Sequence, residues 1–335
     1  MAPKIGVIPG DPSGIGPELV ARLLADDCAK DADILLIGDR HVFELGQSQA
    51  SLGHEMTEVD ASTDDWTATA RFALHPMQTI EADEVRVGEN TEASGRSTLR
   101  VLDQALEFVR AGVIDAIVFA PFNKASMHLA GIGHSDELHY MAEKLGVTNY
   151  ISELNTLDGM WTSRVTSHIA LKDVAATIDG DRIKEATHLI DDTLRRAGFE
   201  RPRIAVAALN PHAGDGGNFG REEIEIIEPA VQELMKTQMA VVGPLPSDTV
   251  FLKVTRGEID GVVTMYHDQG QIALKLLGFD RGVTVQGGLP VPVTTPAHGT
   301  AFDIAGQGTA DVGATRAAFE IACTMVSNWN RDAAA

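Results

Sequence analysis

Short apolar runs alternate with longer stretches of helical periodicity along almost the whole chain. Because their apolar residues recur at helical spacing, six stretches predict helices: Pro17–Leu24, Ser97–Ala111, Asp136–Leu145, Asp181–Ala197, Glu222–Met235 and Val312–Ser327. The apolar runs have the length and composition of strands, namely Ile5–Ile8, Ile34–Ile37, Ala116–Phe119, Ser163–Thr166, Ile204–Ala208 and Gly261–Thr264. Strand and helix in alternation predict an α/β fold with a largely parallel sheet.

The chain has 335 residues, which is too long for one small hydrophobic core and indicates two domains. It has no low-complexity segment, no repeat of fixed period and no obvious linker. Since nothing in the composition separates two halves, we expect interwoven domains, with the chain crossing from one to the other and back.

Charge and composition narrow the class of protein. The apolar fraction of 44% and the charged fraction of 22% are ordinary for a globular enzyme. A formal charge of −21 repels nucleic acids and anionic membranes, so we expect neither as a partner. No apolar run approaches the roughly 20 residues that cross a bilayer, and the first residues do not resemble a signal peptide. These features predict a cytoplasmic protein, with Cys28 and Cys323 as buried thiols.

Three histidines follow predicted strands and carry the strongest chemical signal. They are His168 in Thr-Ser-His, His212 in Asn-Pro-His-Ala-Gly and His267 in Tyr-His-Asp-Gln-Gly. Any one of them alone would more often be structural. Neutral imidazole binds zinc and similar ions, and three protein ligands leave a coordination position for substrate. The set therefore predicts a metal centre assembled by folding, with Asp268 able to accept the second ring N–H of His267.

Other motifs leave two interpretations open. The loop Gly10–Glu18 is neither GxGxxG nor a Walker loop, and a tight strand–helix connection explains it as well as anion binding does. Lys124, after a predicted strand, could bind phosphate or face solvent. Ser135 is expected to cap the following helix. Asp248 could be a general base or a capping residue.

One loop near the C-terminus could hold part of a nucleotide. A proline, a histidine and glycines precede a helix-like stretch, and such a rigid ledge could pack against an adenine or a ribose. The residues concerned are His298, Gly299, Thr300, Ala301 and Asp303.

In combination, four motifs resemble those of the 4-hydroxythreonine-4-phosphate dehydrogenase family of vitamin B6 biosynthesis. The four run in the same order over nearly the full chain: Gly-Asp-Pro-Ser-Gly-Ile-Gly-Pro-Glu at 10–18, Asn-Pro-His-Ala-Gly at 210–214, Tyr-His-Asp-Gln-Gly at 266–270 and His-Gly-Thr-Ala…Asp-Ile-Ala-Gly at 298–306.

The resemblance implies a fold of two interwoven α/β/α domains, similar to isocitrate and isopropylmalate dehydrogenases, with the active site in the interdomain cleft. It implies a nucleotide-binding domain of residues 1–125 plus 285–335, and a metal, substrate and dimerisation domain of residues 126–284. It also implies a homodimer in which each metal site draws ligands from both subunits.

The resemblance assigns roles to individual residues as well. The metal ligands are His168, His212 and His267, and the nucleotide-binding loop is 298–306. Lys275 contacts the substrate, and Asp248 is our candidate for the base. The substrate's second anionic group is assigned to His134 and Ser135, with Lys124 as an additional candidate.

Two positions depart from the family pattern. Thr284 stands where an asparagine is usual, and Val293 stands where an arginine is usual. A substrate carboxylate would lose a bidentate partner that valine cannot replace. Relatives with similar changes act on four-carbon sugar acid 4-phosphates or on cis-dihydrodiols of aromatic acids such as terephthalate.

These residues together predict a metal-dependent, NAD-linked and decarboxylating dehydrogenase of a small anionic hydroxy acid. The expected substrate is 4-hydroxythreonine 4-phosphate or a related sugar acid 4-phosphate. The alternatives are a cis-dihydrodiol dehydrogenase and a non-catalytic small-molecule sensor. Zinc suits three histidines, although magnesium, manganese or cobalt would suit oxygen-rich surroundings. NADP could replace NAD.

Overall fold

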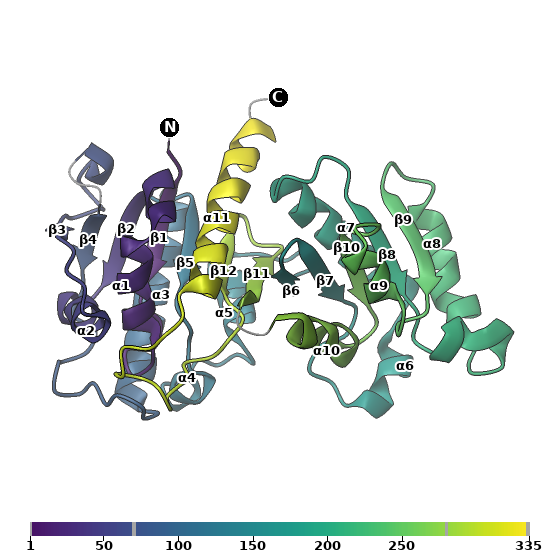
Figure 1. Cartoon of the computed structure of the whole chain (residues 1–335), viewed down its shortest axis with the longest axis horizontal. Coiled ribbons are helices and arrows are strands. Elements are labelled where there is room, and N and C mark those ends of the chain that lie inside the picture. The colour runs from purple at the N-terminus through teal and green to yellow at the C-terminus, as the bar shows by residue number, and fades with distance from the viewer. Residues whose placement is uncertain (1, 69–71, 279–280, 333–335) are drawn as a thin grey trace. The chain divides into compact units, whose positions relative to one another are not determined.

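The computed structural model describes residues 2–68, 72–278 and 281–332, and they form two compact units (Figure 1). Unit 1 contains Met1–Thr148, Val283–Val285 and Leu289–Ala335, and unit 2 contains Asn149–Gly282 and Gln286–Gly288. The chain thus leaves unit 1 and returns to it, which confirms the interwoven arrangement. The boundaries differ from the expected ones, because residues 126–148 cluster with unit 1.

Unit 1 is built on a mostly parallel sheet in the order β3-β4-β2-β1-β5-β12-β11. Only β11 runs antiparallel to its neighbour β12. The strands are β1 (Lys4–Ile8), β2 (Asp33–Gly38), β3 (Thr57–Glu58), β4 (Phe72–Pro76), β5 (Ala116–Phe119), β11 (Val283–Gly287) and β12 (Val293–Pro296).

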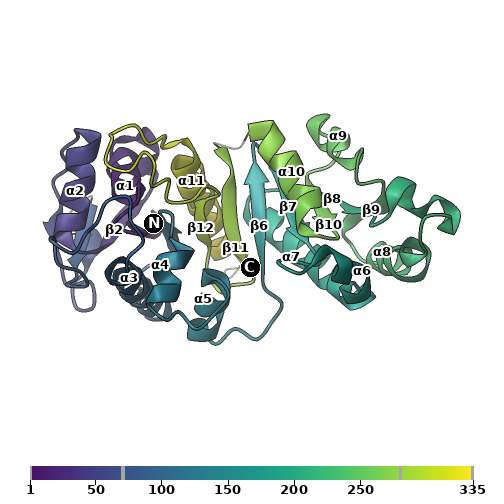
Figure 2. The same cartoon turned by 90° about the horizontal axis from the view of Figure 1, so that it is seen from below.

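Helices cover both faces of this sheet (Figure 2), which is why β1, β2 and β5 are apolar at almost every position and buried. One face carries α1 (Gly16–Ala25), α2 (Arg40–Ala50) and α11 (Gly313–Asp332). The other carries α3 (Glu92–Arg110), α4 (Lys124–Leu129) and α5 (Glu137–Leu145).

Unit 2 repeats this three-layer plan with strand order β6-β7-β10-β8-β9. Strand β6 is antiparallel to β7, and the other neighbours are parallel. The strands are β6 (Ser152–Leu157), β7 (Met160–Arg164), β8 (Arg203–Ala207), β9 (Ala240–Leu245) and β10 (Gly261–Thr264). Helices α7 (Gly180–Arg196) and α8 (Glu228–Leu234) pack on one face, and α9 (Val250–Thr255) and α10 (His267–Gly278) on the other, with α6 (Val174–Thr177) before α7.

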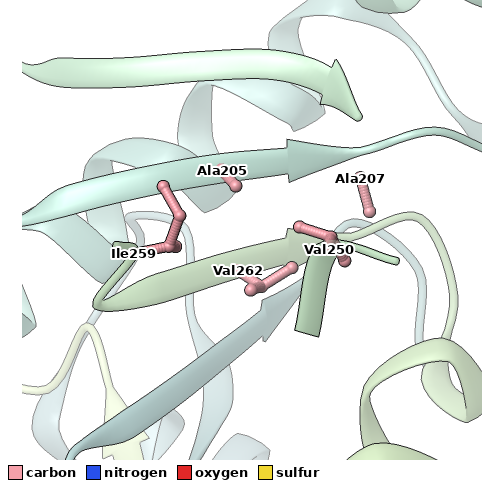
Figure 3. Close-up of a cluster of buried hydrophobic side chains, with 5 residues drawn as sticks. All are labelled: Ala205, Ala207, Val250, Ile259 and Val262. Atoms are coloured by element: carbon pink, nitrogen blue, oxygen red, sulfur yellow. The ribbon is translucent and has the colours of Figure 1, made fainter. Parts of the chain in front are cut away.

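A cluster of buried side chains joins β8, β10 and α9 (Figure 3). Val250 and Val262 are completely buried there, while Leu245, Phe251 and Val254 pack around the cluster as partly buried neighbours. This packing seats α9 against the sheet of unit 2.

The predicted α/β class and parallel sheet are confirmed, and so are five predicted strands within a residue or two at each end. The expected strand Ser163–Thr166 instead ends at Arg164, because Val165 and Thr166 leave the sheet while still bonding to the end of β10. The expected helix from Ser97 begins at Glu92, since Thr91 caps it by accepting from the Ser94 N–H. The expected helix Glu222–Met235 opens with a π-helical turn, Glu223–Ile227.

Both cysteines are free and buried, as predicted. Burial raises the pKa of each thiol to about 12, so neither carries a reactive thiolate at neutral pH. In the described ranges, no helix combines the length and the apolarity needed to cross a membrane.

Gly95 lets α3 and α4 approach closely. A Cβ placed on Gly95 would lie 1.9 Å from the backbone oxygen of Ser126. Alanine normally stabilises a helix interior relative to glycine by up to about 1 kcal/mol. We expect Gly95→Ala to reverse that sign and destabilise the protein by about 1–3 kcal/mol, because backbone atoms must move.

The control for this substitution is Gly53→Ala, where no atom lies within 4 Å of the added methyl group. Urea denaturation should leave the control within about 0.5 kcal/mol of wild type. A Gly95→Ala protein as stable as wild type would show that the two helices do not meet as described.

Candidate active site

The loops after β7 and β10 bring two of the predicted histidines together in unit 2. The backbone N–H of Val165 donates to Thr264, and that of Thr166 donates to Met265, so the parallel pairing continues past both strands. The Thr166 hydroxyl donates to the Met265 carbonyl as well, at 2.8 Å. As a result the rings of His168 and His267 lie 5.8 Å apart, centroid to centroid.

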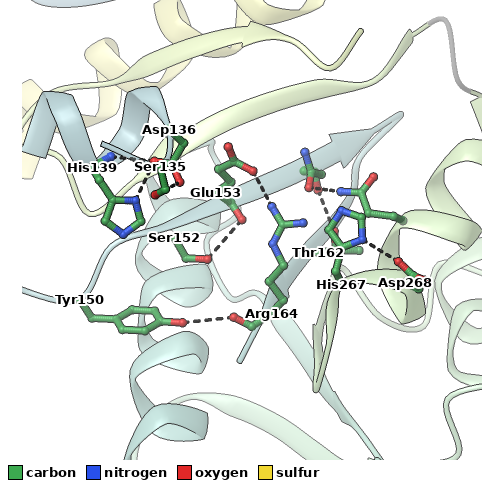
Figure 4. Close-up of polar contacts among 12 residues, drawn as sticks. Ser135, Asp136, His139, Tyr150, Ser152, Glu153, Thr162, Arg164, His267 and Asp268 are labelled. Carbon is green, nitrogen blue, oxygen red and sulfur yellow. Dashed lines mark hydrogen bonds and ion pairs between the residues drawn. The ribbon is translucent and has the colours of Figure 1, made fainter. Parts of the chain in front are cut away.

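His267 is the first residue of α10. Its Nδ1 lies 2.7 Å from Oδ1 of Asp268 (Figure 4). A carboxylate that accepts from Nδ1–H leaves the ring's lone pair on Nε2, which is the arrangement of a metal-binding histidine with a second partner.

Two of the three histidines have a strained backbone. His168 has φ +53° and His212 has φ +55°, in the left-handed region that residues other than glycine seldom occupy. His212 opens a run of six residues with positive φ that ends at Gly217. Strain of this kind costs roughly 1–3 kcal/mol per residue and gathers at functional sites.

Glu223 holds the strained His212 segment in place. One carboxylate oxygen accepts from the backbone N–H groups of Leu209 and Asn210, at 2.9 and 2.7 Å. The other accepts from the Asn210 side chain at 2.9 Å. Glu223 is 3% exposed, so water competes little for these bonds.

One chain does not by itself assemble the predicted three-histidine centre. Among the described residues, no three histidine, cysteine, aspartate or glutamate side chains are grouped so that they could hold a metal ion. The pair His168 and His267, with Asp268 behind it, nevertheless fits part of a metal site. A further ligand would have to come from another segment or from a second copy of the chain.

The other predicted site residues of unit 2 lie at the surface. Lys275 is exposed on α10, about two turns beyond His267. Asp248 is exposed in the turn before α9, and the capping position of that helix is occupied by Thr249. Asp248 is therefore no capping residue, and the interpretation of it as a base stays open.

The two positions that depart from the family pattern are buried. Thr284 on β11 is 9% exposed, and Val293 on β12 is 0% exposed. Val293 pairs with Ile117 of β5 inside the sheet of unit 1. It is therefore part of the hydrophobic core of that sheet.

In unit 1, the loop Gly10–Glu18 is buried along its whole length, which favours a tight connection over a ligand loop. Gly14 packs on Thr300, whose carbonyl accepts from the Ile15 N–H at 3.1 Å. The amide of Asn123 donates to the Thr300 hydroxyl at 3.2 Å. The loop after β12 is thus held by the loops after β1 and β5.

The predicted nucleotide ledge begins where these loops meet. His298 is half-buried, Gly299 is exposed with open space beside its Cα, and Asp303 is exposed. Ala301 has φ +42°, a third strained position among the predicted site residues. Further along, Glu18 accepts from the Ala310 N–H at 3.0 Å, and Arg22 donates to the Gly308 carbonyl. These two bonds tie the end of the loop to α1.

The predicted anion-binding pair of unit 1 contacts carboxylates in this structure. Nε2 of His134 lies 3.0 Å from Glu143, and the Ser135 hydroxyl donates to Asp136. The helix cap is Asp136, whose carboxylate accepts from the His139 N–H, so the expectation that Ser135 caps the helix is wrong. Lys124 is exposed at the first position of α4.

Burial alone would raise the pKa of the Asp136 carboxyl. The hydrogen bonds that it accepts from the backbone N–H and the ring of His139 outweigh burial, and its pKa lies below the ordinary value. Asp136 therefore remains an anion in this loop, which opposes the binding of a second anion nearby unless a cation compensates.

Sequence reasoning missed one charged residue of unit 2. Arg164 ends β7 and forms a buried ion pair with Glu153 (Figure 4). The only sequence signal was an arginine inside a strand directly before the His168 motif, and the expected strand began too late to include residues 160–162.

A parallel α/β protein that gathers histidines at strand ends and presents a loop ledge has the construction of a metabolic enzyme. The family model for the pyridoxal phosphate biosynthetic protein PdxA matches residues 30–322. The chain belongs to this family, which is a family of dehydrogenases.

Similar proteins cover nearly the whole chain. A Pseudomonas aeruginosa protein, provisionally named 4-hydroxythreonine-4-phosphate dehydrogenase 2, is 55% identical over 96% of this chain and 97% of its own. The D-threonate 4-phosphate dehydrogenase of Salmonella typhimurium is 37% identical over 91% and 94%. The crystal structure of 4-hydroxythreonine-4-phosphate dehydrogenase from Klebsiella pneumoniae has a TM-score of 0.84 at 35% identity, covering 97% and 98%.

Asp11 is a completely buried carboxyl in the connection after β1. Its Oδ1 accepts from the Ser13 N–H at 2.8 Å, and its Oδ2 has no hydrogen-bond partner among the described residues. Burial raises the pKa of Asp11 against the opposing effect of the Ser13 N–H. A raised pKa stabilises the folded protein below the unfolded pKa of about 4, and this stabilisation is lost as pH rises through the folded pKa.

We therefore expect Asp11→Asn to stabilise the protein at pH 8, because the amide oxygen can still accept from Ser13 without a buried charge. The gain should shrink as pH falls and the wild-type carboxyl binds its proton. Urea midpoints at pH 5 and pH 8 measure both effects. A variant less stable than wild type at both pH values would contradict this account.

Proposed function

We propose that this protein is a metal-dependent, NAD-linked dehydrogenase of a four-carbon hydroxy acid 4-phosphate, with loss of CO₂ after oxidation. The candidate substrates are 4-hydroxythreonine 4-phosphate and D-threonate 4-phosphate, the compounds in the names of the two relatives. The observation that carries the proposal is the pair of histidine rings 5.8 Å apart, one of them strained and the other backed by Asp268.

His168, His212 and His267 are the proposed metal ligands. Zinc suits three imidazoles best, and magnesium, manganese or cobalt are the alternatives. A divalent metal bound there would lower the pKa of a substrate hydroxyl and stabilise negative charge on its oxygen. Asp268 orients the His267 ring, and Glu223 keeps the His212 segment in its strained conformation.

Asp248 is the proposed base, since its exposed carboxylate can take the proton of the substrate hydroxyl. Bound NAD would supply the acceptor for the hydride that leaves the carbon bearing this hydroxyl. Lys275 would hold the anionic end of the substrate or protonate the carbon from which CO₂ departs. His134, Ser135 and Lys124 are the proposed contacts of the phosphate, and Thr284 stays a proposed substrate contact.

The exposed ledge of unit 1 is the proposed nucleotide site. His298 and Gly299 would contact an adenine or ribose, and Thr300, Ala301 and Asp303 complete the proposed site. NADP is the alternative to NAD. Residues 298–306 include no lysine or arginine that could bind its 2′-phosphate, which favours NAD.

We further propose that the enzyme is a homodimer with shared metal sites. Exposed apolar side chains follow each histidine in the sequence: Leu171 is 69% exposed, Phe219 52% and Leu276 82%. Apolar side chains gathered at a surface mark interaction sites. A second copy would cover them and could supply the ligand that one chain does not bring to the histidine pair.

A substrate panel tests the function. We expect metal-dependent NAD reduction with at least one of the two hydroxy acid 4-phosphates, loss of that activity after treatment with a chelator, and its return with zinc or another divalent ion. Activity only with a cis-dihydrodiol of an aromatic acid, or ligand binding without turnover, would contradict the proposal.

Histidine variants test the metal site. Replacing His168, His212 or His267 by alanine should lower kcat/KM on the order of 100-fold or more and reduce the bound metal. The matched control is His188→Ala, at an exposed position of α7, which should behave as wild type. Unchanged metal content and turnover in the His212→Ala protein would refute its assignment.

Mixing two inactive variants tests the shared site. Suppose that His212 of one subunit joins His168 of the other. A heterodimer of the His168→Ala and His212→Ala chains then contains one intact site of two. After unfolding and refolding together, about half of the dimers are mixed, so about a quarter of wild-type activity should return. No recovery, with dimers verified by sedimentation, would contradict sharing between these two histidines.

A further inference from the structure

Arg164 is the only lysine or arginine within the described ranges that is buried, with 5% of its surface exposed. Arginine is seldom buried without a specific partner. Its terminal nitrogen lies 2.7 Å from Oε2 of Glu153, whose side chain is 18% exposed. Tyr150 donates to the Arg164 carbonyl at 3.1 Å and so helps to hold its backbone.

The strand register of unit 2 places Arg164 at the same height along the sheet as His267. Strands β6 and β7 pair Leu157 with Met160 and Asn155 with Thr162, so one step further the pair is Glu153 with Arg164. The side chains of these alternate residues share one face of the sheet.

Helix α10 packs on this face and runs along it. Residues nearer the start of the helix lie beside residues nearer the end of β7. Leu274 clusters with Leu157 and Met160, and one turn earlier the Gln271 amide donates to Asn155 at 2.5 Å. From Leu274 back to His267 the helix rises about 10 Å, while β7 advances about 13 Å from Met160 to Arg164. The start of α10 therefore lies at the level of Arg164, and Figure 4 shows His267 and Arg164 in one view.

An anionic substrate that binds at this level of the sheet needs a positively charged partner. The chain carries a formal charge of −21, and a substrate with phosphate and carboxylate groups is itself an anion. A guanidinium forks onto a carboxylate with two parallel hydrogen bonds, which a lysine ammonium cannot do. Glu153 shows that the Arg164 guanidinium already binds a carboxylate in this position.

We propose that Arg164 is a specificity-determining residue that binds the carboxylate of the substrate, and that Glu153 holds and neutralises the guanidinium in the free enzyme. This inference rests on the proposed function and deepens it. The substrate carboxylate replaces Glu153 as a partner, or shares the guanidinium with it, and no covalent bond changes. The competing interpretation is an ion pair that only joins β6 to β7.

The two interpretations predict different results for the two partners. If the pair is only structural, Arg164→Gln and Glu153→Gln have similar effects. If Arg164 binds substrate, Arg164→Gln weakens the binding of the carboxylate substrate about 10–100-fold, the range expected for hydrogen bonds to a charged group. Glu153→Gln then leaves binding unchanged or tighter, since a competing carboxylate is gone.

The experiment measures KM and kcat for D-threonate 4-phosphate and, separately, its binding by calorimetry in the metal-loaded dimer. A second probe, the corresponding alcohol phosphate without a carboxylate, should bind wild type and Arg164→Gln equally. Arg164→Lys should recover part of the affinity for the acid. The KM for NAD should not change.

The matched control is Arg203→Gln, because Arg203 pairs with Asp260 at 2.6 Å at the start of β8, the opposite end of the same sheet. It should lose stability without loss of substrate affinity. If Arg164→Gln proves unfolded, the comparison rests on the other two variants. Arg164→Lys should bind the acid more weakly than wild type, whereas Glu153→Gln should bind it equally or more tightly.

Each possible outcome either supports or overturns the proposed role of Arg164. Equal binding of the acid by wild type and by folded Arg164→Gln or Arg164→Lys overturns the proposal for Arg164, while turnover by wild type leaves the proposed function standing. Failure of wild type to bind or oxidise any hydroxy acid phosphate overturns both. A parallel loss of affinity in Arg164→Gln and Glu153→Gln favours the structural ion pair and overturns the proposal.

Discussion

The parallel pairing of β7 with β10 is the constraint on which the candidate site depends. Parallel strands end at the same edge of a sheet, so residues that follow them meet there although about a hundred positions separate them in the sequence. The pairing continues past both strands through Val165 and Thr166, which carries His168 toward the start of α10. The short distance between His168 and His267 follows from this register.

Several energetically unfavourable features of the fold lie near this same edge of the sheet. His168 and His212 have left-handed backbones, and Arg164 is a buried cation. Each would be unfavourable in isolation. The Glu223 carboxylate supports the His212 segment by accepting hydrogen bonds from backbone N–H groups, and the Glu153 carboxylate pairs with Arg164. Since none of these features improves packing, their concentration near one edge is best explained by function.

In unit 1, close packing at glycine residues holds the loops together. Gly10 and Gly14 let the loops after β1, β5 and β12 pack closely on one another, and Gly95 lets α3 approach α4. The result is a rigid base for the ledge that begins at His298. A loop that is completely buried cannot itself wrap a ligand, and the ledge is the exposed part of this assembly.

Apolar periodicity and motif spacing are local properties, and they were enough to predict the α/β class, most central strands and the buried thiols, and to identify the histidine motifs. These patterns gave no prediction for β3, β4, β6, β9 or β12. The polar residues of β6 and β12 are buried by neighbours that no local pattern reveals. Only the tertiary structure decided that Asp136 and not Ser135 caps α5, that Val293 belongs to the core, and that Arg164 lies at the same height along the sheet as His267. Those outcomes depend on strand register and on which side chain reaches a backbone group first, and both are set by contacts between segments distant in the chain.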